Sequence, residues 1–255
     1  MTSLVVPAIG LGVLIGLLLG LVGGGGSILT VPILVYALGL GPHAATATSL
    51  VIVGLSALSG AIPHARADRV QWRTAALFGL AGVLGAFAGA WANRRVSGPV
   101  ILFLFGLLML VVAARMAFGR KAKVNGAITP KPWAIPAAGL LVGIMTGFFG
   151  VGGGFLIVPA LVLVLGLPMR VAVGTSLVII AINSASGVIA QWQAGAFVWP
   201  VAFLMLAGGF VGGQIGGLMA GRVDEEALAK GFGGLVAAVG VYLVGRNGLL
   251  LVQAG

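Results

Sequence analysis

The sequence predicts an all-α polytopic membrane protein built from two homologous repeats, and three observations lead to this prediction. Of the 255 residues, 60% are hydrophobic and only 7% are charged, whereas soluble domains carry about 25% charged residues. Apolar runs long enough to cross a bilayer follow one another along the chain. A constant offset of 127 residues aligns the first half with the second half without gaps. These observations exclude a soluble globule.

A helix needs roughly 20 apolar residues to cross a hydrocarbon core about 30 Å thick. We expect full transmembrane helices over residues 4–22, 44–63, 74–93, 99–118, 134–150, 171–190, 200–220 and 231–252. Two shorter apolar runs, Gly26 to Leu40 and Gly153 to Leu167, begin in glycine clusters and contain Pro32 and Pro159. Because glycine and proline are poor helix formers, we expect these two pieces to be broken or re-entrant.

Each predicted repeat therefore has four full transmembrane helices and one short piece. The first repeat covers residues 1–118 and the second covers residues 134–255. Residues 119–133 form a basic linker that contains proline, and we expect it on the cytoplasmic side. The same offset aligns Trp72 with Trp199 and Arg95 with Arg222, so the register holds beyond the apolar runs.

The distribution of Lys and Arg favours repeats that are inverted relative to each other. If the short pieces cross the membrane, the second repeat is upside down, and 11 of the 14 basic residues fall on one side. If the short pieces return to their own side, the division is 9 against 5. The first division satisfies the positive-inside rule better. We therefore expect inversion, with both termini outside.

Composition also limits the chemistry. The chain has no Cys, two His and four acidic residues, which leaves no candidate catalytic set, metal site or cofactor site. The net charge of +10 reflects membrane topology and not nucleic-acid binding, because the basic residues lie between apolar runs. No Asp or Glu lies inside a predicted helix, so any proton coupling would use the protonation of the substrate itself. His64 lies beside a charged loop, and we expect it to be solvated.

The two glycine clusters are candidate anion-binding sites. Backbone N–H groups at a helix start are unshielded when the residues are glycine, and the helix dipole adds partial positive charge there. The alternative is that the glycines only allow close helix packing, which we expect for Gly85, Gly89, Gly208, Gly212 and Gly216. From the clusters, the candidate binding residues are Gly24, Gly25, Gly26, Ser27, Gly152, Gly153 and Gly154.

Hydroxyl and amide side chains at equivalent positions extend this candidate site. Hydroxyls donate to an anion without placing a charge in lipid, and the candidates are Thr48, Ser49, Thr175 and Ser176. Their alternative role is hydrogen bonding to a helix carbonyl. Asn183 adds an amide donor. His43 and Arg170 are equivalent to each other and would attract anions at a vestibule, or else anchor the helices at the interface.

Several motifs resemble the sulfite exporter TauE/SafE family, also called the toluenesulfonate uptake permease family. The first half contains GGGGSILTVPIL (residues 23–34), ATATSL (45–50) and RVQWR (69–73). The second half contains GVGGGFLIVPAL (150–161) and AVGTSL (172–177). The resemblance covers nearly the whole chain and both repeats. The chain departs from it at position 43, where the first half has His43 although a basic residue such as Arg170 is common in the family.

The resemblance implies a multi-pass transporter in the bacterial inner membrane that moves sulfite or organosulfonates such as sulfoacetate. We expect alternating access, in which the two halves rock about a central site formed by the glycine clusters and the hydroxyls. A passive anion channel is the alternative. The partners that we expect are the anion and the lipid bilayer, and glycine-lined helix faces would also allow a homodimer.

Overall fold

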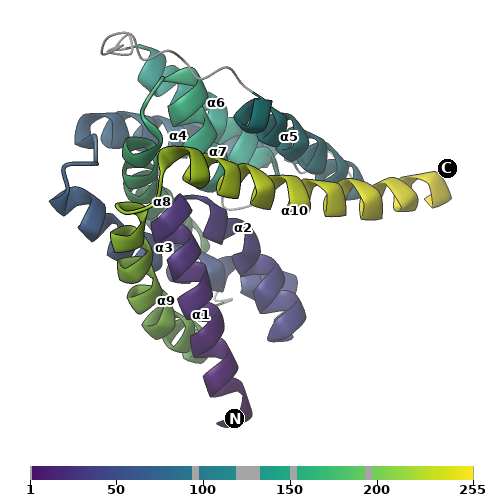
Figure 1. Ribbon diagram of the computed structural model, residues 1–255. Helices are drawn as coiled ribbons and strands as arrows, with labels where there is room; N and C mark the ends of the chain where they lie inside the picture. Colours follow the sequence, from purple (N-terminus) through teal and green to yellow (C-terminus); the bar gives the residue numbers. More distant parts are fainter. Residues whose placement is uncertain (1, 94–97, 119–132, 150–153, 193–196, 255) are drawn as a thin grey trace.

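The computed structural model describes residues 2–93, 98–118, 133–149, 154–192 and 197–254, and all regular structure in these ranges is helical (Figure 1). The first half contains α1 (Thr2–Val22), α2 (Gly25–Pro32), α3 (Pro42–Arg66), α4 (Trp72–Asn93) and α5 (Gly98–Phe118). The second half contains α6 (Ala134–Phe149), α7 (Gly154–Pro159), α8 (Met169–Gln191), α9 (Trp199–Ala220) and α10 (Glu225–Ala254). The predicted all-α class is thereby confirmed for the described residues.

Within the described ranges, five helices are long and apolar enough to cross a membrane. They are Ala44–Arg66 in α3, Trp72–Gly89 in α4, Met169–Ile189 in α8, Trp199–Ala220 in α9 and Glu226–Gly245 in α10. Shorter apolar stretches lie in the other three predicted spans, namely Val6–Val22 in α1, Phe103–Arg115 in α5 and Ala134–Phe148 in α6. The chain is therefore a multi-pass membrane protein.

The two short apolar pieces are indeed broken helices. α2 and α7 each continue into one turn of π-helix, η1 (Ile33–Ala37) and η2 (Ala160–Val164). Gly39 and Gly166 then adopt positive φ angles of 69° and 68°, a conformation that glycine adopts without steric cost. The backbone bond from Leu38 to Ile33 (3.2 Å) has its counterpart between Leu165 and Ala160 (3.1 Å). A π-turn after each proline thus ends both pieces in the same way.

Two helix pairs form the most closely packed parts of the fold. Gly12 and Gly16 of α1 face the carbonyl groups of Met205 and Gly209 of α9, and because both numbers rise together the helices run parallel. A Cβ on either glycine of α1 would overlap its facing carbonyl group. Close backbone approach through small residues is the usual way in which membrane helices pack. Figure 1 shows α1 lying along α9.

The pair α4 and α6 is packed in the same way. Gly139, Gly143 and Gly147 of α6 lie against the backbone of Phe78, Gly82 and Ala86 of α4, again in parallel. The glycines expected to serve helix packing also lie in these two pairs. Gly85 and Gly89 face α6, while Gly208, Gly212 and Gly216 face α1.

Two other pairs run antiparallel. Gly54 of α3 lies against Ser184 of α8, whereas Leu50 lies against Gly187, so the residue numbers change in opposite directions. Gly106 of α5 lies against Val244 of α10, whereas Met109 lies against Gly240, so this pair is antiparallel as well. Figure 1 shows α5 beside α10, which extends to the C-terminus away from the other helices. The centre of the fold is thus the α3–α8 pair, flanked by α1 with α9 and by α4 with α6.

Candidate functional site

The break between α1 and α2 brings the two short helices together. Gly23 has a φ of 77°, which lets the chain turn out of α1. A Cβ on Gly24, the next residue, would overlap the carbonyl group of Gly154 at the start of α7. The two short helices therefore begin backbone against backbone, at a contact that only glycine allows at position 24. We call this place the glycine crossing and define it by Gly23, Gly24, Ser27, Gly154 and Ser176.

Two serine hydroxyls adjoin this crossing. A Cβ on Gly154 would lie 2.6 Å from the Ser27 oxygen, and a Cβ on Gly23 would lie 2.6 Å from the Ser176 oxygen. Both serines are buried. Ser27 Oγ donates to the Gly24 carbonyl (2.6 Å), and Ser176 Oγ donates to the carbonyl three residues before it (2.8 Å). The predicted alternative role, a bond to the local helix carbonyl, is thus present in this structure.

Gly25 and Gly26 face other helices. The nearest atom to a Cβ on Gly25 would be the Leu235 side chain of α10, at 3.1 Å. A Cβ on Gly26 would lie 2.5 Å from the carbonyl oxygen of Ile15 in α1. Gly152 and Gly153, the remaining cluster residues of the prediction, lie outside the described residues.

Thr48 and Thr175 hold the starts of two long helices. The Val198 N–H, just before α9, donates to Thr48 Oγ1 at 3.0 Å. The Gln71 N–H, just before α4, donates to Thr175 Oγ1 at the same distance. Both threonines are fully buried. Because the first N–H groups of a helix have no partner within it, each threonine satisfies a group that is costly to leave unpaired.

Ser49 and Arg170 also make local contacts. Ser49 Oγ donates to the Thr46 carbonyl at 2.7 Å, as Ser176 does in the second half. Arg170 donates from Nη2 to the Val223 carbonyl at 2.9 Å, which ties the start of α8 to the connection between α9 and α10. Its Nε is buried and has no hydrogen-bond partner among the residues that the structure describes. The backbone of His43 lies in the first turn of α3, and its side chain lies outside the described part.

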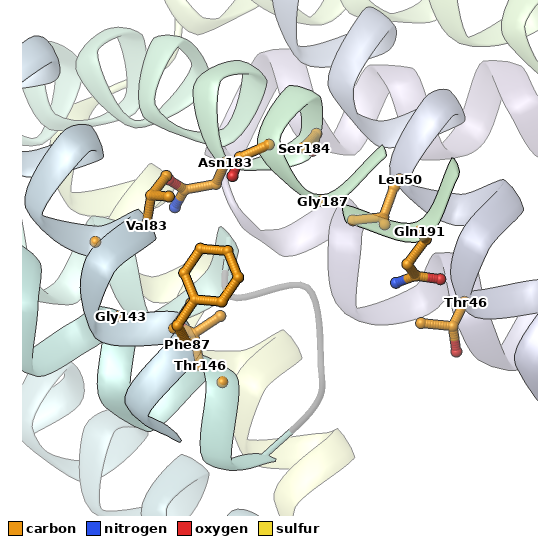
Figure 2. Close-up of a pocket in the computed structure, with 14 residues that line it drawn as sticks. Thr46, Leu50, Val83, Phe87, Gly143, Thr146, Asn183, Ser184, Gly187 and Gln191 are labelled. Atoms are coloured by element: carbon orange, nitrogen blue, oxygen red, sulfur yellow. The ribbon is translucent and has the colours of Figure 1, made fainter. Parts of the chain in front are cut away.

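Asn183 lies on α8 two turns after Ser176. It lines a cavity of about 270 Å³ between α3, α4, α6 and α8 (Figure 2). Figure 2 shows Asn183 extending towards Val83 of α4, while Gln191 lies beside Leu50 and Thr46 of α3. Six polar residues line this space, which we call the α8 cavity: Thr46, Thr146, Asn183, Ser184, Ser186 and Gln191. No charged residue is among the described residues of its wall.

The corresponding surface of α3 is closed. Ser59 Oγ donates to the Phe210 carbonyl of α9 at 2.7 Å, and His64 Nε2 lies 3.0 Å from the Gly20 carbonyl oxygen of α1. Ser56 lies directly against the position that a Cβ on Gly209 would occupy. We call these contacts of Ser56, Ser59 and His64 the α3 seal, and all three side chains are buried.

The expectation that His64 is solvated was wrong. His64 is fully buried in the last turn of α3, and the charged loop begins only after it. The partner of its imidazole is on α1, where Nε2 lies 3.0 Å from the Gly20 carbonyl oxygen. Sequence reasoning also missed Ser186 and Gln191. Their signal was present, because both are polar, lie within or at the end of an apolar run and match Ser59 and His64 at the 127-residue offset.

Comparisons with known proteins agree with this picture. The model of the sulfite exporter TauE/SafE family matches residues 8–243. A probable membrane transporter protein of Xylella fastidiosa (strain Temecula1) is 38% identical, over 98% of both chains. The probable membrane transporter protein YunE of Bacillus subtilis is 24% identical, over 92% of this chain and 95% of the relative.

The relative YfcA of Escherichia coli K12, also named a probable membrane transporter protein, is 27% identical over 76% of this chain and 73% of its own length. No solved structure matches the chain. The names of the family and of these relatives describe transport and not an enzymatic reaction. The resemblance seen in the motifs is confirmed: this chain is a multi-pass membrane transporter that belongs to the sulfite exporter TauE/SafE family.

Proposed function

We propose that this protein is a secondary transporter of small sulfur-containing anions, sulfite or organosulfonates such as sulfoacetate, and that it works by alternating access. The observation that carries the proposal is the glycine crossing. Two interrupted helices from opposite halves begin against each other there, with the hydroxyls of Ser27 and Ser176 beside them. Interrupted helices with N-termini that point at an anion are a common device of transporters with inverted repeats.

Packing directions support inverted halves. In the sequence order of the helices, the parallel α1–α9 pair and the antiparallel α3–α8 pair agree only if α2 with η1 and α7 with η2 each reverse the direction of the chain. Pieces that pass across the membrane would produce this reversal. If both pieces returned to their own side, α3 and α8 would run parallel. The equivalent helices α3 and α8 also begin 127 residues apart, at Pro42 and Met169.

The anion is held by neutral groups in this proposal. A full charge in the bilayer core is costly, whereas backbone N–H groups and hydroxyls bind an anion weakly enough to release it. The four acidic residues lie away from the spans' centres: Asp68 follows α3, and Asp224, Glu225 and Glu226 stand at the start of α10. No carboxylate of the described residues therefore opposes an anion at the crossing.

Binding requires the glycine crossing to open. Because Gly24 contacts Gly154 directly, an anion enters only when α2 and α7 separate. The serine hydroxyls then exchange their carbonyl acceptors for the anion. Gly25, Gly26, Gly152 and Gly153 supply further N–H groups, and Thr48, Ser49 and Thr175 complete the surroundings, while Asn183 donates to the anion from two turns further along α8. His43 and Arg170 lie at the starts of α3 and α8, where they raise the local anion concentration.

Uptake by proteoliposomes tests this proposal. Sulfite, sulfate, sulfoacetate and an aryl sulfonate are compared as substrates of the purified protein. We expect saturable uptake of a sulfur anion that accumulates against a concentration gradient. Non-saturating flux that never exceeds equilibrium would contradict alternating access and favour a channel. No uptake of any of these anions would contradict the substrate class.

Two conservative variants test the site. Ser27→Ala and Ser176→Ala each remove one hydroxyl, and a hydrogen bond to a charged group contributes about 1.5–3 kcal/mol. We therefore expect half-maximal uptake to need at least about tenfold more anion. Thr30→Val is the matched control, because Thr30 is a buried hydroxyl in α2 that bonds the Gly26 carbonyl (3.0 Å) in the same way. Wild-type uptake by both serine variants would show that the anion does not bind at the glycine crossing.

A further inference from the structure

The α8 cavity is the polar-lined cavity that the glycine crossing does not explain; a second cavity, of about 400 Å³ between α3 and α8, is lined almost entirely by apolar residues. The α8 cavity encloses about 270 Å³, whereas a water molecule occupies about 30 Å³ of the liquid. The space therefore admits several waters or a small hydrated anion. Its wall combines amide and hydroxyl groups, such as those of Asn183 and Ser186, with the apolar side chains of Leu50, Val83 and Phe87.

The polar residues of α8 in this cavity are equivalent to those of the α3 seal. Subtracting 127 from the numbers of Asn183, Ser186 and Gln191 gives Ser56, Ser59 and His64. The facing residues correspond as well, because Gly82, Val83 and Gly147 line the cavity while Gly209, Phe210 and Gly20 contact the seal. One arrangement of residues is thus open in one half and closed in the other.

The closed and open arrangements can be compared by distance at two equivalent contacts, Gly209 with Ser56 and Gly82 with Asn183. A Cβ on Gly209 would lie 3.3 Å from Ser56 Cβ and even closer to its hydroxyl. A Cβ on Gly82 would lie 3.7 Å from the tip of the Asn183 amide, although that side chain is longer. The Asn183 amide oxygen is buried without a hydrogen-bond partner among the described residues.

The flanking helix pairs do not share the difference. A Cβ on Gly143 of α6 would overlap the Gly82 carbonyl, and a Cβ on Gly16 of α1 would overlap the Gly209 carbonyl, with the same approach in both pairs. The α4–α6 and α1–α9 pairs are therefore packed alike. What differs is how the central helix, α8 or α3, lies against its pair.

We infer that the α8 cavity is the open substrate vestibule, that the α3 seal is the equivalent vestibule in its closed form, and that the two exchange during transport. This inference rests on the proposed function. Its ligand is a small sulfur-containing anion. Asn183, Ser186 and Gln191 donate hydrogen bonds to the oxyanion, and Leu50, Val83 and Phe87 contact the organic part of a sulfonate.

The vestibule and the glycine crossing lie on the same helix, α8. Asn183 follows Ser176 by seven residues on α8, which is about 10 Å along the helix axis. The cavity lies at the end of α8 that precedes the uncharged connection, whereas the α3 seal lies next to the loop with Arg66, Arg69 and Arg73. By the positive-inside rule the seal is cytoplasmic and the cavity faces outward.

Thiol labelling tests which vestibule is open. The chain has no native cysteine, so Ser186→Cys and Ser59→Cys give one thiol each at equivalent positions. A membrane-impermeant maleimide is added to right-side-out and inside-out vesicles. Because a minor conformation is populated at up to about 10%, we expect Ser186→Cys to react from outside at least about tenfold faster than Ser59→Cys reacts from inside. Sulfoacetate should slow the reaction of Ser186→Cys; sulfite is not used here because it adds to the maleimide itself.

Disulfide pairs test the exchange. Gly82→Cys with Asn183→Cys crosslinks only after the cavity closes, and Gly209→Cys with Ser56→Cys crosslinks in the state described here. A disulfide needs Cβ atoms about 3.5–4.5 Å apart, and the second pair is close to this range. We expect each disulfide to abolish uptake of sulfoacetate, which unlike sulfite does not cleave disulfides, and a reductant to restore it, which also shows that the variants fold.

The outcomes separate this inference from the proposed function. Equal labelling of Ser186→Cys and Ser59→Cys, or labelling of Ser186→Cys from neither aqueous side, would overturn the vestibule. Full uptake with either disulfide formed would overturn the exchange. Wild-type uptake of sulfur anions in the same vesicles reports on the proposed function independently of both results.

Discussion

α3 and α8 occupy equivalent places in the two halves but contact their neighbours differently. α3 is hydrogen-bonded to both helices of the pair that flanks it, through Ser59 to α9 and through His64 to α1. α8 leaves the α8 cavity between itself and α4 with α6. The glycine-packed pairs on either side are alike. The comparison indicates that the α1–α9 and α4–α6 pairs are packed alike. The open and the closed side differ in how α8 and α3 pack against these pairs.

The largest effect is expected at the contact that both halves share. Gly24→Ala places a Cβ onto the Gly154 carbonyl, so α2 and α7 must separate. Overpacking costs about 1–3 kcal/mol where side chains can yield, and a backbone cannot yield so easily. We expect loss of monodisperse protein in detergent gel filtration. Gly10→Ala is the control, because no atom lies within 4 Å of its Cβ. Equal behaviour of the two variants would refute the close crossing.

The next effect should be the same in both halves. Thr48→Val and Thr175→Val each leave the N–H of a helix start unpaired, at Val198 and at Gln71. An unsatisfied buried group costs about 1–3 kcal/mol, so we expect a lower melting temperature for both. Thr48→Ser and Thr175→Ser keep the oxygen and should melt close to wild type. A lower melting temperature for only one of the two valine variants would show that the two contacts are not equivalent.

The halves should differ when the ends of the central helices are changed. His64→Leu removes a hydrogen bond in the α3 seal, which is worth about 1.5 kcal/mol. Gln191→Leu, at the equivalent position, only changes the wall of the α8 cavity. We expect a clear decrease in melting temperature for His64→Leu and a much smaller change for Gln191→Leu. A similar decrease in both would mean that the open side is held as firmly as the closed side.

The smallest effect is expected at the serines. Ser59→Ala removes the bond to the Phe210 carbonyl, which contributes about 1 kcal/mol. Ser186→Ala removes a hydroxyl from the cavity wall. The reaction of a thiol at His64→Cys from the inside should be faster in the Ser59→Ala background and unchanged in the Ser186→Ala background. No acceleration by Ser59→Ala would show that this bond does not hold the seal.

Much of the fold was predictable from local features. The glycine clusters with Pro32 and Pro159 predicted two interrupted helices, because these residues act on the backbone where they stand. The π-turns at Ile33–Ala37 and Ala160–Val164 were not foreseen. A π-turn depends on which carbonyl each N–H reaches after the proline, and apolar periodicity carries no signal for it.

The placement of the candidate site residues was predictable only in part. Ser27 and Gly154 were expected to lie together and do so, since both belong to helix starts in equivalent clusters. The partners of Thr48 and Thr175 were not foreseeable, because Val198 and Gln71 are distant in sequence and meet them only through the packing of helices. The position of His64 was misjudged for a similar reason: the neighbouring residues in sequence are charged, but the neighbour in space is Gly20.

The most direct measurement of the central claim, that the two halves are inverted, compares two single thiols. Ala67→Cys lies just after α3, and Trp192→Cys lies just after α8, where the tryptophan is 62% exposed. An impermeant maleimide is applied to intact cells and to inside-out vesicles. The account predicts that Trp192→Cys reacts in intact cells and that Ala67→Cys reacts only in inside-out vesicles. Reaction of both thiols from the same side would contradict the inversion and, with it, the assignment of an open and a closed vestibule.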